Sequence, residues 1–435
     1  MSDPVQRTND FLQKHNISAQ AIDMKELIER FAHEMERGLA GDPASSLQMI
    51  PTYTKVAESL PVDEPVIVLD AGGTNLRSCL VHFDEAGKAH ITDFRKTLMP
   101  GVKEEVSAAK FFKVIADEVE RLIDKSDRIG FCFSYAAEIL SNLDGVPIIF
   151  SKEIKAPEVI GKPVGASLLA ELARRGHDVS TKRIAVLNDT VATLLAGVSA
   201  KSDVPYSGFV GFILGTGTNT AYVEDNQKIK KLSLPEGQQI INVESGNFDY
   251  VPGIIDQTFF DSTKHSHAYH LEKMISGAYL GPLSGMIISQ AIKEGLFSPT
   301  FAQRFAAIGQ LSTAVMSNYL EMPFNEEYAL VSCVKGNEED AKVLWMLLDA
   351  TIARAAKLTA ANLAATILKT DDGKDPRHPV LINADGTTFY KTQNLKKYTD
   401  FFLYQYLEVE HGRSYRFTQI ADSPTIGAAI AALGM

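Results

Sequence analysis

Two aspartates each stand at the end of an apolar strand pattern, and both are candidates for chemistry. Asp70 ends the run VIVLD, and Asp189 follows the run IAVLN. A buried carboxylate is costly unless a partner neutralises it, and a nucleotide-bound Mg²⁺ would be such a partner for Asp70. Transfer of a phosphoryl group to an alcohol needs a base that takes the hydroxyl proton, a task that Asp189 could perform. The alternatives are that Asp70 caps a turn and Asp189 caps a helix.

A Gly/Thr turn follows an apolar strand pattern twice, in LDAGGTN at 69–75 and in ILGTGTN at 213–219, with a constant offset of 144 residues. Glycines at a hairpin tip let backbone N–H groups approach an anion, and Thr74, Thr218 and Arg77 add further donors. One such turn is common in hairpins, but two at matched positions favour duplicated halves that clamp a phosphate. The turn residues are Gly72, Gly73, Thr74, Asn75, Gly215, Thr216, Gly217 and Thr218.

Strand and helix patterns alternate around these turns. Apolar runs at 129–134, 183–187 and 379–386 predict further strands, and most strands cluster into hairpins. We therefore expect α/β sheets with a mixed strand order. Helices are predicted at about 18–40, 104–125, 164–175, 338–368 and 398–409, with a last strand, turn and helix over 418–435.

Length and composition predict a cytoplasmic protein of two domains. The 435 residues exceed what one hydrophobic core normally organises. Acidic residues outnumber basic ones by 54 to 43, and the net charge of −11 disfavours a nucleic-acid partner. The sequence lacks an apolar run of membrane-spanning length and a secretory signal pattern, so no membrane partner is expected. The three cysteines, Cys79, Cys132 and Cys333, are far apart in the sequence, which fits a reducing compartment. We expect either a monomer or a homodimer.

Several segments together resemble the hexokinase family, within the actin-like ATPase superfamily. In the family's order, and across about residues 24–430, they are FAHEMERGLAG, LQMIPTY, LDAGGTNLR, LNDTVATLLAG, GFILGTGTNTAY, INVESGNFD, EKMISGAYLG and LINADGTTFYK. The resemblance implies a single-unit hexokinase of bacterial size that transfers the γ-phosphoryl group of ATP to the 6-hydroxyl of glucose or a close relative, with Mg²⁺.

The resemblance also implies a two-domain actin-like (ribonuclease H-like) α/β fold, with mixed sheets around an interdomain cleft. The small domain would comprise 61–189 plus 421–435, and the large domain 1–60 plus 190–420. Domains of this kind close on the sugar and expel water.

Individual roles follow from the resemblance as well. Asp189 would be the general base, in a catalytic set with Lys152 and Arg77, and Asp70 would hold Mg²⁺ through water. Thr74, Arg77 and Thr218 would face the nucleotide phosphates, with Gly427 in the C-terminal nucleotide turn. The hexose contacts would be Ser134, Ser151, Lys152, Asn188, Asp189, Asn219 and Glu244.

The sequence departs from the family pattern around the sugar. A Ser-Phe-Pro run is Ser134-Tyr135-Ala136 here, a Gly-Glu pair is Gly281-Pro282, and a Pro-Gly-Gln-Gln loop is replaced by 266–269. The C-terminal nucleotide turn reads SPTIGAA at 423–429. A lost acceptor changes discrimination between sugars strongly. These departures leave open which hexose and which phosphoryl donor are preferred.

Other functions stay open on the sequence. The altered sugar motifs would also fit a kinase for another sugar derivative, or a catalytically weak sugar sensor or regulator, against which the retained Asp70, Arg77 and Asp189 argue. An actin- or chaperone-like ATPase would share the hairpins but not the sugar motifs. The histidines of KHSHAYH, at 265, 267 and 270, have spacings that predict a solvated loop near the sugar and not a metal site.

Overall fold

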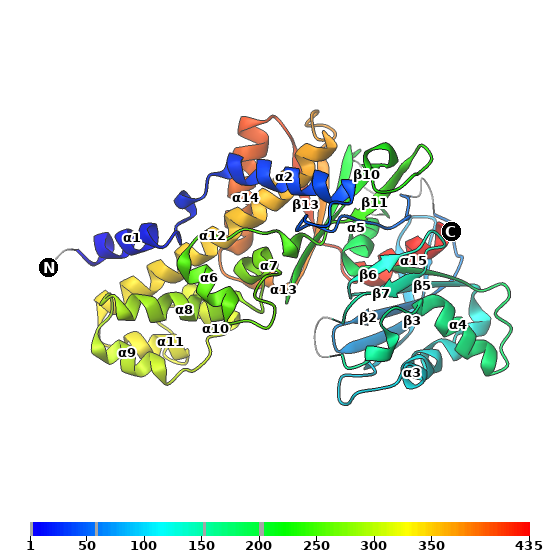
Figure 1. Ribbon diagram of the computed structural model, residues 1–435, viewed down its shortest axis with the longest axis horizontal. Coiled ribbons are helices and arrows are strands. Elements are labelled where there is room, and N and C mark those ends of the chain that lie inside the picture. Colours follow the sequence, from blue (N-terminus) through cyan, green and yellow to red (C-terminus); the bar gives the residue numbers. More distant parts are fainter. Residues whose placement is uncertain (1–2, 57–59, 151–153, 200–203) are drawn as a thin grey trace.

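The computed structural model describes residues 3–56, 60–150, 154–199 and 204–435. Its strands form a six-stranded sheet, a five-stranded sheet and a two-stranded ribbon. Figure 1 shows two lobes: one at the right holds the five-stranded sheet with its helices, and the other extends to the left as an array of helices. Among the described residues, no helix is both long and apolar enough to cross a membrane.

The five-stranded sheet has the order β4-β3-β2-β5-β8. Its strands are β2 (Val66–Gly72), β3 (Asn75–Phe83), β4 (Ala89–Leu98), β5 (Arg128–Phe133) and β8 (Arg183–Leu187). The strands β2 and β3 form an antiparallel hairpin, whereas β2, β5 and β8 run parallel. Ile67 and Leu69 face a core with α3 (Ala108–Glu120) and α4 (Val164–Arg174), and Val66 and Val68 face the opposite core. Because both faces are covered, β2 is apolar on both sides until Asp70.

The six-stranded sheet has the order β1-β11-β10-β9-β12-β13. Its strands are β1 (Ile50–Pro51), β9 (Gly208–Leu214), β10 (Thr218–Asp225), β11 (Gln238–Asn242), β12 (Val380–Asp385) and β13 (Tyr415–Thr418). The strands β9, β10 and β11 are antiparallel neighbours, and β12 and β13 run parallel to β9. The separate ribbon pairs β6 (Ala137–Ile139) with β7 (Gly145–Pro147). The sequence prediction of mixed strand orders is confirmed.

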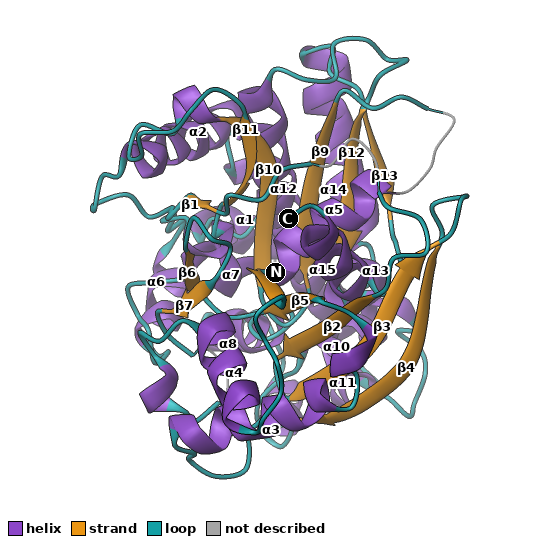
Figure 2. Cartoon of the chain, turned by 90° about the vertical axis from the view of Figure 1, so that its right-hand side faces the viewer, coloured by secondary structure: helices purple, strands orange, loops and turns teal. Residues whose placement is uncertain are grey.

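Two helices, α5 (Asp189–Ser199) and α15 (Ser423–Leu433), lie between the two large sheets (Figure 2). They approach their neighbours closely at glycines. A Cβ on Gly427 of α15 would lie 1.9 Å from the carbonyl oxygen of Ala192 in α5, and one on Gly211 of β9 would lie 2.4 Å from that of Thr190. A Cβ on Gly130 of β5 would lie 2.1 Å from the carbonyl oxygen of Ala428 in α15. Backbone-to-backbone packing therefore connects the sheet that carries Asp70 to the sheet that carries the second Gly/Thr turn.

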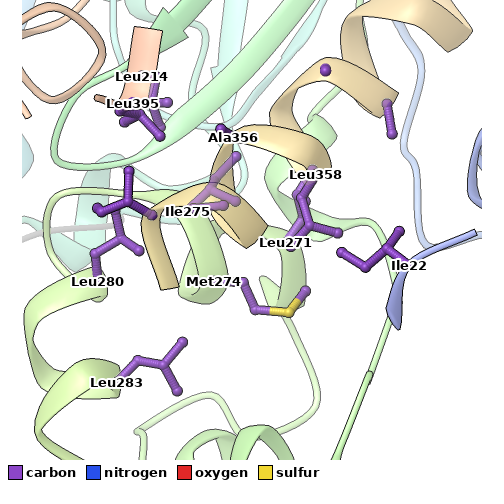
Figure 3. Close-up of a cluster of buried hydrophobic side chains, with 14 of the residues drawn as sticks. Ile22, Leu214, Leu271, Met274, Ile275, Leu280, Leu283, Ala356, Leu358 and Leu395 are labelled. Carbon is purple, nitrogen blue, oxygen red and sulfur yellow. The ribbon is translucent and has the colours of Figure 1, made fainter. Parts of the chain in front are cut away.

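The largest core belongs to the helical lobe. Its centre is α12, a helix of 33 residues whose first turn is capped by Asn337. Leu271, Met274 and Ile275 of α7 gather with Leu280 and Leu283 of α8 around Ala356 and Leu358 of α12 (Figure 3). The helices of this lobe are α1 (Pro4–Lys14), α2 (Met24–Ala40), α6 (Ile254–Asp261), α7 (His270–Ile275), α8 (Leu280–Lys293), α9 (Pro299–Ala306), α10 (Thr313–Glu321), α11 (Ala329–Val334), α12 (Glu338–Thr370), α13 (Thr387–Lys391) and α14 (Leu395–Leu403).

Three predicted helices differ from the structure at their ends. The helix predicted at 18–40 is a short 3₁₀ turn followed by α2, because the Asp23 side chain accepts from the backbone N–H of Glu26 and starts a new helix there. The helix predicted at 104–125 is shortened to α3, which begins after the Ser107 cap. The helix predicted at 398–409 starts earlier, as α14, and continues as a π-helix, Tyr404–Glu410.

Candidate active site

The buried carboxylate of Asp70 is paired with Arg77. The two residues are directly opposite each other in the β2–β3 hairpin, and Arg77 Nη1 donates to Asp70 Oδ2 at 2.5 Å. Asp70 is only 4% exposed, and this burial raises the pKa of its carboxyl. The positive charge of Arg77 opposes the shift, whereas the negative charge of the nearby Asp189 raises the pKa further. Arg77 was predicted to contact the phosphates, and Asp70 was predicted to hold Mg²⁺. The structure brings the side chains of Arg77 and Asp70 together.

The tip of this first hairpin is a two-residue turn, Gly73-Thr74, between the paired Gly72 and Asn75. Gly73 has φ +56°, a backbone conformation that favours glycine. Its carbonyl accepts from the Tyr135 hydroxyl at 2.7 Å, and the carbonyl of Thr74 accepts from the Met99 N–H at 2.9 Å. The predicted phosphate turn is therefore held by two neighbours from outside the hairpin.

Asp189 begins α5 but does not cap it. The side-chain oxygen of the preceding Asn188 accepts from the Thr190 N–H at 2.8 Å, and this bond caps the helix. The Asp189 Oδ1 atom accepts from the Thr190 hydroxyl at 3.4 Å. Asn188, and not Asp189, therefore caps the helix, and the Asp189 carboxylate is available for other chemistry.

A chain of amide side chains runs from this junction into the six-stranded sheet. Asn219 Nδ2 lies 3.5 Å from Asn188 Oδ1 and donates to Asn242 Oδ1 at 2.6 Å, and Asn242 Nδ2 donates to Glu244 Oε1 at 2.9 Å. Glu244 has φ +57°, which is strained for a non-glycine residue. The structure brings the predicted hexose residues Asn188, Asn219 and Glu244 together. It adds Asn242, which was not predicted although it is a polar residue directly after Ile240 and Ile241 at the end of β11.

The second hairpin is held by a carboxylate. Glu272, from α7, accepts from the Thr218 N–H at 2.9 Å, and a Cβ on Gly217 would lie 2.5 Å from the same Glu272 oxygen. The Thr218 hydroxyl donates to Ile213 O within its own hairpin at 2.9 Å, while Gly215 O accepts from the Thr388 hydroxyl at 2.8 Å. The contact between Glu272 and Thr218 joins residues that are 54 positions apart in the sequence. The segment EKMISGAYLG, which contains Glu272, resembles a family motif, but no role was predicted for Glu272 itself.

The remaining predicted residues are distributed as follows. Ser134 is buried at the end of β5, and its N–H donates to Ala71 O at 3.2 Å. Thr216 is exposed in the second turn. Gly427 is buried against Ala192 of α5, so the structure gives it a packing position. Ser151 and Lys152 lie outside the described residues.

A small, largely enclosed cavity lies beside these residues, where β5, β6 and β8 meet β11. Its polar lining comes from Thr52, Tyr135, Asn188 and Asn242. Asp385, at the end of β12, adds a further carboxylate that sequence analysis did not single out. Burial raises the pKa of Asp385, and the charges of Asp189 and Asp422 raise it further. Carboxylates from β2, α5 and β12 therefore act electrostatically on one another at this end of the sheets.

The histidine prediction is wrong for His270. It is buried at the start of α7, where Nδ1 bonds Asp249 Oδ1 at 2.7 Å, Nε2 bonds Ser266 O at 3.0 Å, and the ring stacks on Phe260. His265 and His267 are exposed in the preceding loop, as predicted. Within the described ranges, no three His, Cys, Asp or Glu side chains form a metal-binding group.

Comparison with known proteins gives matches along nearly the whole chain. Two family models described as hexokinase match residues 7–199 and 209–434. Human hexokinase HKDC1 is 29% identical over 409 residues, which cover 89% of this chain and 44% of that protein. The hexokinase of Schistosoma mansoni is 28% identical over 392 residues, covering 85% and 84%. The chain thus spans under half the length of the human protein and most of the Schistosoma protein.

Solved structures show the same fold. The hexokinase from Schistosoma mansoni complexed with glucose has a TM-score of 0.78 at 23% identity, over 100% of both chains. A glucokinase from an Antarctic psychrotroph has a TM-score of 0.53 at 15% identity, covering 86% of this chain and 99% of that one. At these identities the likeness concerns the arrangement of sheets and helices.

Proposed function

The chain belongs to the hexokinase family, with its actin-like α/β fold, and we propose that it transfers the γ-phosphoryl group of ATP to the 6-hydroxyl of a hexose, glucose or a close relative. The observation that carries the proposal is the arrangement at the start of α5. There the charge of Asp189 raises the pKa of Asp70, which pairs with Arg77, and the preceding Asn188 lies 3.5 Å from Asn219 of the amide chain. Phosphoryl transfer needs a base, a charged phosphate site and an acceptor site in this proximity.

Asp189 is the general base of the proposed reaction. Its carboxylate accepts the proton of the hexose 6-hydroxyl as that oxygen bonds to the γ-phosphorus and the bond from phosphorus to the β–γ bridging oxygen of ATP breaks. Because Asn188 makes the bond that caps α5, protonation of Asp189 leaves the helix start intact. The products are a hexose 6-phosphate and ADP.

The hexose binds along the amide chain. Asn188, Asn219 and Glu244 offer donors and acceptors that suit ring hydroxyls, and Asn242 fixes the orientation of two of these side chains by bonding both Asn219 and Glu244. Ser134 supplies a further hydroxyl at the end of β5. Ser151 and Lys152 complete the proposed set.

The nucleotide phosphates lie between the two Gly/Thr hairpins, within reach of Arg77 and the turn residues. Mg²⁺ characteristically uses one or two protein carboxylates plus phosphate oxygens and water, so the single buried carboxylate of Asp70 fits its donor set. Bound there, the metal would neutralise charge on the phosphates. Arg77, which already pairs with Asp70, would add a second cation to the same place.

Closure of two domains around the substrates is part of the proposal. The division into 61–189 plus 421–435 and 1–60 plus 190–420 assigns one large sheet to each part and leaves α5 and α15 between them. Closing the cleft would exclude water, which otherwise competes with the hexose for the γ-phosphoryl group.

The proposal is tested by identifying the product. The protein is incubated with Mg-ATP and glucose, and ³¹P NMR follows the phosphorus signals. The expected result is a sugar 6-phosphate formed in step with ADP. Release of inorganic phosphate in place of a sugar phosphate, or no loss of ATP with glucose, mannose, fructose or glucosamine, would contradict the proposed function.

A further inference from the structure

Tyr135 connects the small cavity beside Asn188 to the tip of the first hairpin. Its ring is 2% exposed and is held edge-on against Phe133 and Phe150, with ring centroids 4.9 and 5.1 Å apart. The same residue lines the small cavity with Asn188 and Asn242. Its hydroxyl reaches out of this apolar setting and donates to Gly73 O at 2.7 Å, across 62 positions of sequence.

The hydroxyl keeps its proton in this position. Burial raises the pKa of Tyr135, and the charges of Asp189 and Asp70 raise it further. A protonated hydroxyl is a donor, and the Gly73 carbonyl is its acceptor. The bond is therefore present across the pH range in which a kinase works, and the aromatic packing fixes the place from which it is made.

The bond determines how the turn presents its next N–H group. In a trans peptide the C=O and N–H of one unit point in opposite directions. With the Gly73 carbonyl held toward Tyr135, the N–H of Thr74 points away from Tyr135, toward the open side of the hairpin, where Thr74 is exposed. The Met99 bond holds the next carbonyl, that of Thr74. The two peptide units at the tip are thus oriented by separate donors.

The geometry points to Tyr135 as a positioning residue for nucleotide binding: its hydroxyl orients the Gly73–Thr74 peptide so that the turn offers its N–H to a nucleotide phosphate. This inference rests on the proposed kinase function. Tyr135 touches no reacting atom in this account; it acts through the backbone of the hairpin. A phenylalanine would keep the ring contacts and leave the turn without this orientation.

The test compares Tyr135→Phe with wild type by calorimetric titration of Mg-AMP-PNP and, separately, of glucose. Loss of one neutral hydrogen bond predicts a dissociation constant for Mg-AMP-PNP that is roughly three- to tenfold higher, with glucose affinity and kcat within about twofold of wild type. Tyr319→Phe is the matched control, because Tyr319 is equally buried and its hydroxyl donates to Ala341 O at 3.1 Å away from both hairpins. The control variant should bind both ligands as wild type does.

The outcomes separate the two proposals. If wild-type protein binds no Mg-AMP-PNP, the proposed function fails. If wild type binds it and Tyr135→Phe binds it equally well, the role of Tyr135 is refuted while the function stands. If Tyr135→Phe loses nucleotide and glucose affinity together with a lower melting temperature, the hydroxyl serves general stability, and the positioning role is refuted as well.

Discussion

Two hairpins that share the sequence Gly-Thr-Asn lie on the two large sheets and are held in different ways. The β2–β3 turn carries a buried carboxylate with its own cation, Asp70 and Arg77, and receives donors from Tyr135 and Met99 at its carbonyls. The β9–β10 turn gives its N–H to a carboxylate from another helix, Glu272. Each hairpin therefore has its own carboxylate: Asp70 of the first is paired with Arg77, and Glu272 occupies one backbone donor of the second.

This difference teaches that two similar turns can be held in place by different contacts. The first hairpin stands in the sheet that also leads to Asp189, so its surroundings hold the charges of the proposed reaction. The second leads into Asn219, Asn242 and Glu244, a neutral amide chain ending in one carboxylate. We expect changes in the first region to alter turnover and changes in the second to alter sugar binding and local stability.

The largest expected effect is at Asp189. Replacing it with Asn removes the proton acceptor and keeps the shape, so kcat should fall by roughly 10²–10⁴-fold. Glucose affinity, measured by titration, should stay within a fewfold of wild type. A matched control is Asp178→Asn, an exposed aspartate in the loop before β8, which should keep full turnover. Wild-type turnover in Asp189→Asn would remove this residue from the mechanism.

A change at Glu244 should affect glucose affinity more than turnover. Glu244→Ala removes a charged acceptor from the end of the amide chain and leaves Asn242 Nδ2 without its partner. The dissociation constant for glucose should rise about ten- to hundredfold, with a smaller change in kcat at saturating sugar. Glu236→Ala, at an exposed position before β11, is the control. Unchanged glucose affinity in Glu244→Ala would break the assignment of the second sheet to sugar binding.

Glu272 should matter chiefly for stability. Its replacement by Ala leaves the Thr218 N–H without its carboxylate acceptor, and the free energy of unfolding should fall by about 1–3 kcal/mol. Denaturant titration measures this, with the exposed Glu321→Ala at the end of α10 as the comparison. If Glu272→Ala is as stable as Glu321→Ala, the second hairpin does not depend on this carboxylate.

The smallest expected effect is a gain in stability at Asp70. Burial raises the pKa of Asp70 above its value in the unfolded chain. Between these two pKa values the folded state binds more protons than the unfolded state, so the free energy of unfolding falls as the pH rises through this interval. At neutral pH, Asp70→Asn should therefore melt roughly 1–2 °C higher than wild type and lose activity. The gain should disappear in acid, below both pKa values. A lower melting temperature at neutral pH would mean that the Arg77 attraction outweighs the burial cost.

Much of this architecture is predictable from local patterns. The family resemblance and the α/β fold with mixed sheets are confirmed. The Asp70–Arg77 pair was also within reach, because a two-residue turn at 73–74 places residue 70 opposite residue 77. The start of α2 at Met24 could also be predicted, because Asp23 is a common capping residue. The apolar pattern that continues before Asp23 led to a longer predicted helix. The domain boundaries stay a prediction.

What local patterns cannot give are the contacts that join distant segments. Tyr135 reaches Gly73 and Glu272 reaches Thr218 only because the sheets and α7 fold together. Asn242 belongs to the amide chain because the register of β10 and β11 pairs it with Ala221, two residues along β10 from Asn219, so the two amides are diagonal neighbours. These side chains decide how each hairpin is oriented, and a single sequence carries no periodic signal for them.

The measurement that tests the central claim most directly is hexose-dependent ADP release from Mg-ATP. Wild type and Asp189→Asn are compared with glucose, mannose, fructose, glucosamine and N-acetylglucosamine in one coupled assay, with thermal shift by each sugar recorded on the same samples. We predict turnover with at least one hexose that is lost in Asp189→Asn while the thermal shift persists. A thermal shift without turnover in wild type would contradict the kinase and would instead indicate a sugar-binding protein that performs no transfer.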